Sequence, residues 1–157
     1  MMLKRIVSGG QTGADRGGLE AAITLSIPHG GFCPRGRLAE DGFIPYKYEL
    51  VETVSRDYPD RTLRNIAAAD GTLIFIESLV TAGPGSRLTI SIAMRVRKPF
   101  LTIELSRGRK TAPARIRGWL KRFKVQTLNV AGSRESTVPG IGKAVRDLLV
   151  ETLRGGT

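Results

Sequence analysis

Three short segments of this chain carry the residue types best suited to holding an anion. The first, residues 8–15, reads SGGQTGAD and follows an apolar run that ends at Val7. A strand that passes through glycines into a helix directs free backbone N–H groups and the positive end of the helix dipole at one point. Glycine also lacks the Cβ that would hold a phosphate away from the backbone. We therefore predict a phosphate-binding loop here; the alternative is a tight turn in which Asp15 caps the helix.

The other two segments add hydroxyl and guanidinium groups. Residues 82–89 repeat the pattern of glycines before a predicted helix, and residues 33–42 place two arginines around a glycine, with forked donors that suit phosphate or carboxylate. All three segments follow predicted strands, so we expect them to meet at one edge of a sheet. The residues that we single out are Arg35, Gly36 and Arg37 in the middle segment and Gly85, Ser86, Arg87 and Thr89 in the last.

The first segment does not match the standard nucleotide-binding motifs. The pattern G-x-G-x-x-G is absent, and no acid ends the second predicted strand where it would hold a ribose. Gly13 and Gly18 have the Walker A spacing, but Leu19 and Glu20 follow where Lys and Ser or Thr are required. These departures argue against classical NAD binding and against P-loop NTPase activity.

Histidine and cysteine are too scarce for a zinc cluster or a disulfide. His29 and Cys33 are the single residues of their types, so we predict no structural metal and a protein of the reducing cytoplasm. The first residues lack the apolar region of a signal peptide. No apolar run approaches the roughly 18 residues that a membrane span needs, so we expect no membrane partner.

Strands and helices alternate along the chain, which positions these segments. Parallel strands need crossover helices, so the alternation predicts a mainly parallel sheet with helices on both faces. A length of 157 residues indicates a single domain over residues 1–157. The predicted strands are 3–8, 29–32, 50–54, 71–76, 99–103 and 125–130; the predicted helices are 15–26, 61–69, 86–97, 113–124 and 141–153; residues 34–48 form a long ordered loop.

The net charge of +11 is concentrated in one part of the chain. Between Arg95 and Lys124 there are eleven Lys and Arg residues and one acid, Glu104. Such a block attracts anionic partners, nucleic acid included, or forms a solvated helix face. Its aromatic residues look like core residues, whereas single-stranded nucleic acid needs exposed rings for stacking. The aromatic and aliphatic residues that we expect to face inward on the helix at 113–124 are Ile116, Trp119, Leu120 and Phe123.

Several of these stretches together resemble a known family, named for molybdenum cofactor carriers. The matching stretches, in order, are GGQTGADRGGLEAA, PRGRLAEDGFIPYKYELVET, RTLRNIAAADGTLIF, GSRLTISIA, KPFL and LNVAGSRES. The resemblance covers about residues 6–149. It extends to a wider group of Rossmann-like proteins that includes the cytokinin-activating phosphoribohydrolases and the DNA-processing protein of natural transformation.

The resemblance implies a three-layer α/β/α Rossmann-like fold and a homo-oligomer, either a dimer or a tetramer. It also implies a phosphorylated pterin or nucleotide-like ligand, with the molybdenum cofactor as the named candidate. Two helix N-termini with Arg35, Arg37 and Arg87 would match the terminal phosphate and anionic metal centre of that cofactor. Carried onto this chain, the ligand-binding residues are Gly9, Gly10, Gln11, Thr12, Gly13, Asp15, Arg35, Gly36 and residues 85–89.

Two other functions stay open at this stage. The phosphoribohydrolases carry a glutamate on the helix after the third segment, but that helix here reads GSRLTISIA and has no acid. Hydrolysis would then depend on Asp15, Glu40, Asp41 or Glu77, so a non-catalytic binding protein is favoured over a nucleoside-monophosphate phosphoribohydrolase. The second alternative is a single-stranded nucleic-acid-binding protein that uses residues 95–124.

Overall fold

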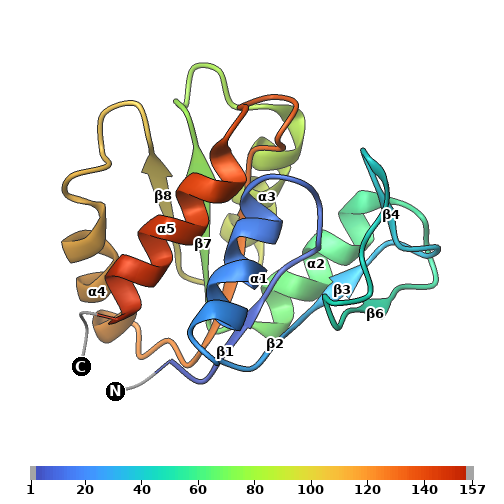
Figure 1. Cartoon of the computed structure of the whole chain (residues 1–157), viewed down its shortest axis with the longest axis horizontal. Coiled ribbons are helices and arrows are strands. Elements are labelled where there is room, and N and C mark those ends of the chain that lie inside the picture. Colours follow the sequence, from blue (N-terminus) through green and yellow to red (C-terminus); the bar gives the residue numbers. More distant parts are fainter. Residues whose placement is uncertain (1–2, 155–157) are drawn as a thin grey trace.

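The structure is a computed structural model that describes residues 3–154 (Figure 1). At its centre lies a parallel five-stranded sheet in the order β2-β1-β9-β7-β8. The strands of this sheet are β1 (Arg5–Val7), β2 (His29–Gly30), β7 (Gly71–Ile76), β8 (Phe100–Glu104) and β9 (Thr127–Gly132). The predicted α/β fold with a mainly parallel sheet is therefore confirmed.

Five helices cover the two faces of this sheet. They are α1 (Ala14–Thr24), α2 (Tyr58–Ala68), α3 (Pro84–Arg95), α4 (Ala112–Arg122) and α5 (Ile141–Arg154). In Figure 1, α5 crosses in front of the sheet between α1 and α4, while α2 and α3 pack together on the other face. This gives the three layers that a Rossmann-like fold requires.

The last strand of the chain lies in the middle of the sheet. β9 pairs with β1 on one side and with β7 on the other, although fifty residues (77–126) separate it from β7 in sequence. Along the chain, β2 pairs on the outer side of β1 and β8 pairs on the outer side of β7. β9, the last strand, then lies between β1 and β7. Ligands of parallel α/β sheets bind where the strand order reverses, at the carboxyl ends of the strands. In this protein that place is at the carboxyl ends of β1, β9 and β7, the upper end of the sheet in Figure 1.

The strand predicted at residues 29–32 is divided between two sheets. β2 pairs with β1, whereas β3 (Phe32–Cys33) pairs with β6 (Val51–Glu52) in a separate parallel ladder. Gly31 between them adopts a φ of +127°, and a Cβ there would lie 2.8 Å from the backbone nitrogen of Ser8. Because β1 lies so close, the chain leaves the main sheet at Gly31. The strand predicted at 50–54 is present as β6, and it pairs with β3 instead of joining the main sheet.

The loop predicted at residues 34–48 contains a small hairpin. Its strands, β4 (Leu38–Ala39) and β5 (Gly42–Phe43), are antiparallel. Gly42, at the start of β5, has a φ of +109°, a conformation that glycine adopts without strain.

The predicted inner face of α4 is partly wrong. Ile116 and Trp119 are buried, as predicted, and Leu120 is partly buried against the same core. Phe123 is 42% exposed because α4 ends at Arg122, so this ring lies beyond the last turn and tilts against Trp119 at a centroid distance of 6.0 Å.

Candidate functional site

A cavity of about 320 Å³ opens at the upper end of β1, β9 and β7. Its walls come from the segment after β1, the first two turns of α2, the start of α3 and the segment after β9. The first and last glycine-rich segments therefore meet at one site, as the sequence predicts. The predicted residues that line it are Gly9, Gln11, Asp15, Gly85, Ser86 and Thr89.

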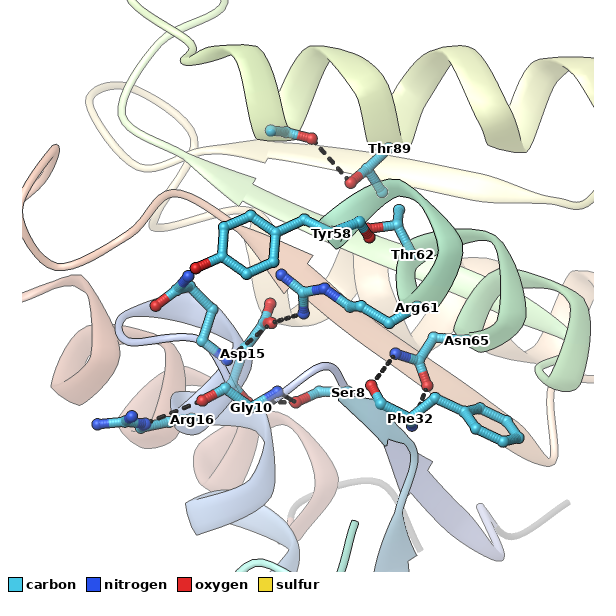
Figure 2. Close-up of polar contacts among 12 residues, drawn as sticks. Ser8, Gly10, Asp15, Arg16, Phe32, Tyr58, Arg61, Thr62, Asn65 and Thr89 are labelled. Atoms are coloured by element: carbon cyan, nitrogen blue, oxygen red, sulfur yellow. Dashed lines mark hydrogen bonds and ion pairs between the residues drawn. The ribbon is translucent and has the colours of Figure 1, made fainter. Parts of the chain in front are cut away.

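The floor of this cavity is built around a buried ion pair. Arg61 Nη1 donates to Asp15 Oδ2 at 2.8 Å, and the two side chains are only 11% and 8% exposed. Figure 2 shows Arg61 reaching from α2 to the carboxylate at the start of α1, beneath the ring of Tyr58. A Cβ on Gly9 would overlap the Arg61 guanidinium, so glycine at this position makes room for the arginine. The close approach that the sequence predicts at Gly9 is thus made by a side chain of the protein itself.

The backbone N–H groups of the first segment are mostly used inside the loop. Gly10 N donates to Ser8 Oγ at 3.2 Å, Gln11 N to Asp15 Oδ2 at 3.1 Å, and Thr12 N to the side chain of Gln11 at 3.0 Å. The prediction of a set of free N–H groups at residues 8–15 is therefore wrong for these three amides. The alternative interpretation of this segment is a tight turn in which Asp15 caps the helix. The Asp15 carboxylate accepts from the backbone N–H of Gln11 and also binds Arg61.

The side chain of Gln11 has a fixed orientation. Its Oε1 accepts hydrogen bonds from the backbone N–H groups of Thr12 at 3.0 Å and Glu40 at 2.9 Å. Two donors on Oε1 leave the amide NH₂ group on the opposite side, and its nitrogen has no partner among residues 3–154. Gln11 is only 5% exposed, and it lines the cavity. Arg61 Nε is a second buried donor without a partner in this described part of the chain.

The start of α3 forms the opposite wall and is open to an approaching ligand. Gly83 caps the helix and Pro84 begins it, so the first N–H groups of the helix face the cavity without an intrahelical acceptor. A Cβ built on Gly83 or Gly85 would meet nothing within 4 Å. Ser86 is buried in this wall, and its hydroxyl neither donates nor accepts a hydrogen bond within residues 3–154.

Two guanidinium groups flank one aromatic ring at the mouth of the cavity. The Arg61 and Arg134 guanidinium carbons lie 5.3 Å and 5.1 Å from the centroid of the Tyr58 ring. Arg134 forms no ion pair with a carboxylate among the described residues. Its charge is thus available to an anion, and it comes from the segment after β9 that the sequence did not single out.

The middle predicted segment does not line the cavity. Arg37 is buried in its own loop, where its guanidinium donates to the carbonyl oxygens of Ile44, Pro45 and Tyr48 at 2.8–3.0 Å. Gly36 N donates to the Glu52 carboxylate at 2.7 Å, and the neighbouring Arg35 is exposed to solvent. The expectation that this segment joins the other two is therefore wrong, because carbonyl oxygens of its own loop hold the Arg37 guanidinium.

Four further predicted residues also lie outside the cavity wall. Gly10 packs against Ile44, and Arg87 donates to carbonyl groups of its own loop, those of Ala82 at 3.0 Å and Leu79 at 3.3 Å. Thr12 and Gly13 line a second, more open hollow between α1 and α5.

The charged residues of the second hollow are largely paired with one another. Arg16 binds Asp41 through two hydrogen bonds, and Lys47 lies 2.6 Å from Glu20. Partial burial acts to raise the pKa of Glu40, but hydrogen bonds from Ser136 and Thr12 outweigh it and hold that pKa below its usual value. Because these groups satisfy each other, the hollow offers little free charge to a ligand.

The basic residues at 95–124 do not form one continuous strip. Arg95 and Lys98 precede β8, whereas Arg107 and Lys110 follow it. The two pairs of basic residues therefore lie toward opposite ends of this strand. Of the aromatic residues in this block, Phe123 is the exposed one, as described above. A linear nucleic-acid strand would meet these charges in separate groups.

The described residues contain no cluster of three or more His, Cys, Asp or Glu side chains suited to a metal ion. None of the helices in residues 3–154 has the length and apolar character needed to cross a membrane.

Comparisons with known proteins agree with this architecture. Residues 6–153 match the model of the circularly permutated YpsA SLOG family. The structure superimposes on the crystal structure of a "putative molybdenum carrier protein" from Syntrophus aciditrophicus with a TM-score of 0.91 and 43% sequence identity, over 96% of this chain and 94% of that one. No curated protein gives a significant match. Because the family model covers nearly the whole chain, we conclude that this protein belongs to the circularly permutated YpsA SLOG family.

Proposed function

We propose that this protein binds a phosphorylated small molecule in the cavity and carries it without chemical change. The observation that carries the proposal is the open start of α3. Its N–H groups face the cavity, and the missing Cβ atoms of Gly83 and Gly85 leave room for an anion at the backbone. A helix N-terminus of this kind favours a phosphate group through its free N–H groups and its dipole.

The molybdenum cofactor is the cargo that we consider first. The Syntrophus aciditrophicus protein, which is 43% identical, is named a putative molybdenum carrier. A pterin phosphate with an anionic metal centre has two negative ends, and the cavity has positive groups at two places. These are the first turn of α3 and the guanidinium group of Arg134 at the mouth. The residues present therefore suit this cargo in charge.

The carboxylates around the cavity favour binding over hydrolysis. Asp15 is the one carboxylate that lines this cavity within the described chain, and its Oδ2 is already held by Arg61 and by Gln11 N. Glu40 and Asp41 bind Thr12 and Arg16 outside it. General acid–base cleavage of a glycosidic bond needs a group free to transfer a proton to the leaving base.

Ligand content and ligand-induced stabilisation test the proposal together. The protein purified from cells supplied with molybdate is analysed for molybdenum by mass spectrometry and for phosphate after acid release. Separately, its melting temperature is measured with inorganic pyrophosphate and with nucleoside monophosphates, because a ligand that binds only the native state raises it. Absence of bound molybdenum and phosphate, together with no rise for any phosphate compound, would refute a phosphate-binding carrier. Release of free base from a nucleotide would support the hydrolase instead.

A further inference from the structure

The inner end of the cavity contains a set of hydrogen-bonding atoms that the proposed phosphate contact does not use. They belong to Gln11, Arg61 and Asp15, which are joined through one carboxylate oxygen. Asp15 Oδ2 accepts from the backbone of Gln11 and from the guanidinium of Arg61. Asp15 Oδ1 accepts no hydrogen bond from any residue between 3 and 154.

Two of these residues offer donors whose directions are fixed. The Gln11 amide cannot rotate without breaking its two backbone contacts at Oε1, so Nε2 remains the free donor. Arg61 is held at Nη1 by Asp15 and across its face by Tyr58, which leaves Nε unpaired. A buried N–H without an acceptor is unfavourable, because it has lost its hydrogen bond to water and gained none. A ligand that supplies an acceptor at this point recovers part of that cost.

The pattern of free atoms selects a particular chemical edge. It consists of two donors, Gln11 Nε2 and Arg61 Nε, beside one acceptor, Asp15 Oδ1. A cyclic amide presents the complement, because its carbonyl oxygen accepts and its adjacent ring N–H donates. An amidine edge, as in adenine, offers the single lone pair of a ring nitrogen as its acceptor, so it can satisfy at most one of the two donors.

We infer that Gln11, Arg61 and Asp15 form a specificity subsite for the cyclic-amide edge of a fused heterocycle, and that this subsite selects oxo-purine or oxo-pterin phosphates over amino-purine phosphates. The inference rests on the proposed function, since the phosphate of the same ligand is assigned to the start of α3. Both orphan donors are covered from solvent in this structure. The half-buried Tyr58 ring packs on the Arg61 guanidinium, so its displacement would expose the donor of Arg61 to the heterocycle.

A matched pair of nucleotides tests the subsite. Inosine monophosphate and adenosine monophosphate differ only at this edge of the base, so we compare their dissociation constants by calorimetry, with inorganic pyrophosphate as a probe of the phosphate contact alone. Inosine monophosphate should bind at least about tenfold more tightly, because a site built to hydrogen-bond one group rejects the analogue that lacks it.

The variant Gln11→Glu replaces the unpaired donor at Gln11 Nε2 with a hydrogen-bond acceptor. One carboxylate oxygen still accepts from Thr12 N and Glu40 N, so the loop is kept, but the other replaces the Nε2 donor with an acceptor. The preference for inosine monophosphate should disappear or reverse, while pyrophosphate affinity changes much less. Gln126→Glu, the same change in the chain's other glutamine, just before β9 and outside the cavity lining, should keep the preference. Circular dichroism verifies that both variants fold.

The outcomes separate the two proposals. Equal binding of the two nucleotides, or an unchanged preference in Gln11→Glu, overturns the subsite. Binding of pyrophosphate with binding of neither nucleotide also overturns the subsite but leaves the phosphate contact standing. If no phosphate compound binds, the proposed function fails, and the subsite fails with it.

Discussion

The guanidinium group of Arg61 lies on the backbone of Gly9, in the space that a Cβ would occupy. Arg61 thereby reaches the Asp15 carboxylate at 2.8 Å and closes the inner end of the cavity. The glycine that the sequence assigned to phosphate binding is needed first for this internal ion pair. The phosphate contact that we propose is therefore at the start of α3, where no side chain fills the corresponding space.

Gly9→Ala should destabilise the protein by about 1–3 kcal/mol, because the added methyl group displaces Arg61 from Asp15. In an Arg61→Ala background the same change should cost much less, since the methyl group then has room. Urea denaturation of both single variants and the double variant measures the coupling. Additivity within about 0.5 kcal/mol would contradict a direct contact between the two residues.

Arg61→Met should lower the free energy of unfolding by about 3–5 kcal/mol, because it leaves the buried Asp15 carboxylate without its cation. Arg64→Met serves as the control. Arg64 lies one turn further along α2 and pairs with Asp60 at the surface, so its loss should cost about 1 kcal/mol or less. Similar losses in the two variants would show that the buried pair has no special weight.

Gly85→Asp should abolish the stabilisation by pyrophosphate without unfolding the protein. The new Cβ meets nothing within 4 Å, and an acid in the first turn of a helix is favourable, yet its charge repels an anion at the start of α3. Gly118→Asp makes the same change at an open glycine on α4 and should leave binding intact. Unchanged pyrophosphate binding in Gly85→Asp would place the phosphate elsewhere.

Arg134→Ala should weaken binding of phosphate compounds about tenfold, because it removes the unpaired guanidinium group at the mouth of the cavity. Arg35→Ala should leave affinity unchanged, since Arg35 is exposed and outside the cavity wall. Titration calorimetry at one fixed salt concentration compares them. A larger loss in Arg35→Ala than in Arg134→Ala would restore the middle segment to the site.

Asp70 should contribute to stability in a pH-dependent way. Its carboxylate accepts from the backbone N–H groups of Thr127 and Gln126, both at 2.9 Å, and these bonds lower its pKa. A lowered folded-state pKa means that the contribution is complete above the unfolded value of about 3.9 and is lost as the pH falls through the lower folded value.

Urea midpoints measured from pH 7 down to pH 2.5 test this contribution. Asp70→Asn should reduce the loss of stability on acidification, because the group that must take up a proton is gone. Glu151→Gln is the control, since Glu151 is exposed and its carboxylate accepts no hydrogen bond in the described structure, so the substitution should change the stability little. If the urea midpoints of the wild type and of Asp70→Asn fell by the same amount as the pH is lowered, a role for these hydrogen bonds would be contradicted.

The sequence determined most of the elements and brought out two of the segments that line the cavity. The apolar run at residues 71–76 predicted β7 with its observed bounds, and all five predicted helices are present within a few residues. These features depend on neighbours within about one or two turns of the chain, and residue spacing records such neighbours directly. The resemblance carried by the ordered stretches also identified the family type that the comparisons support.

The tertiary structure decided which side chains meet. Arg61 binds Asp15 across 46 residues, and Arg134 reaches the cavity because β9 inserts between β1 and β7. Neither approach leaves a periodic signal, so nothing in the residue pattern favoured these arginines over Arg35 or Arg37. In the same way, glycines at 9 and 85 look equivalent in the sequence. Only the packing around them shows that the space beside one is filled by the protein and the space beside the other is open.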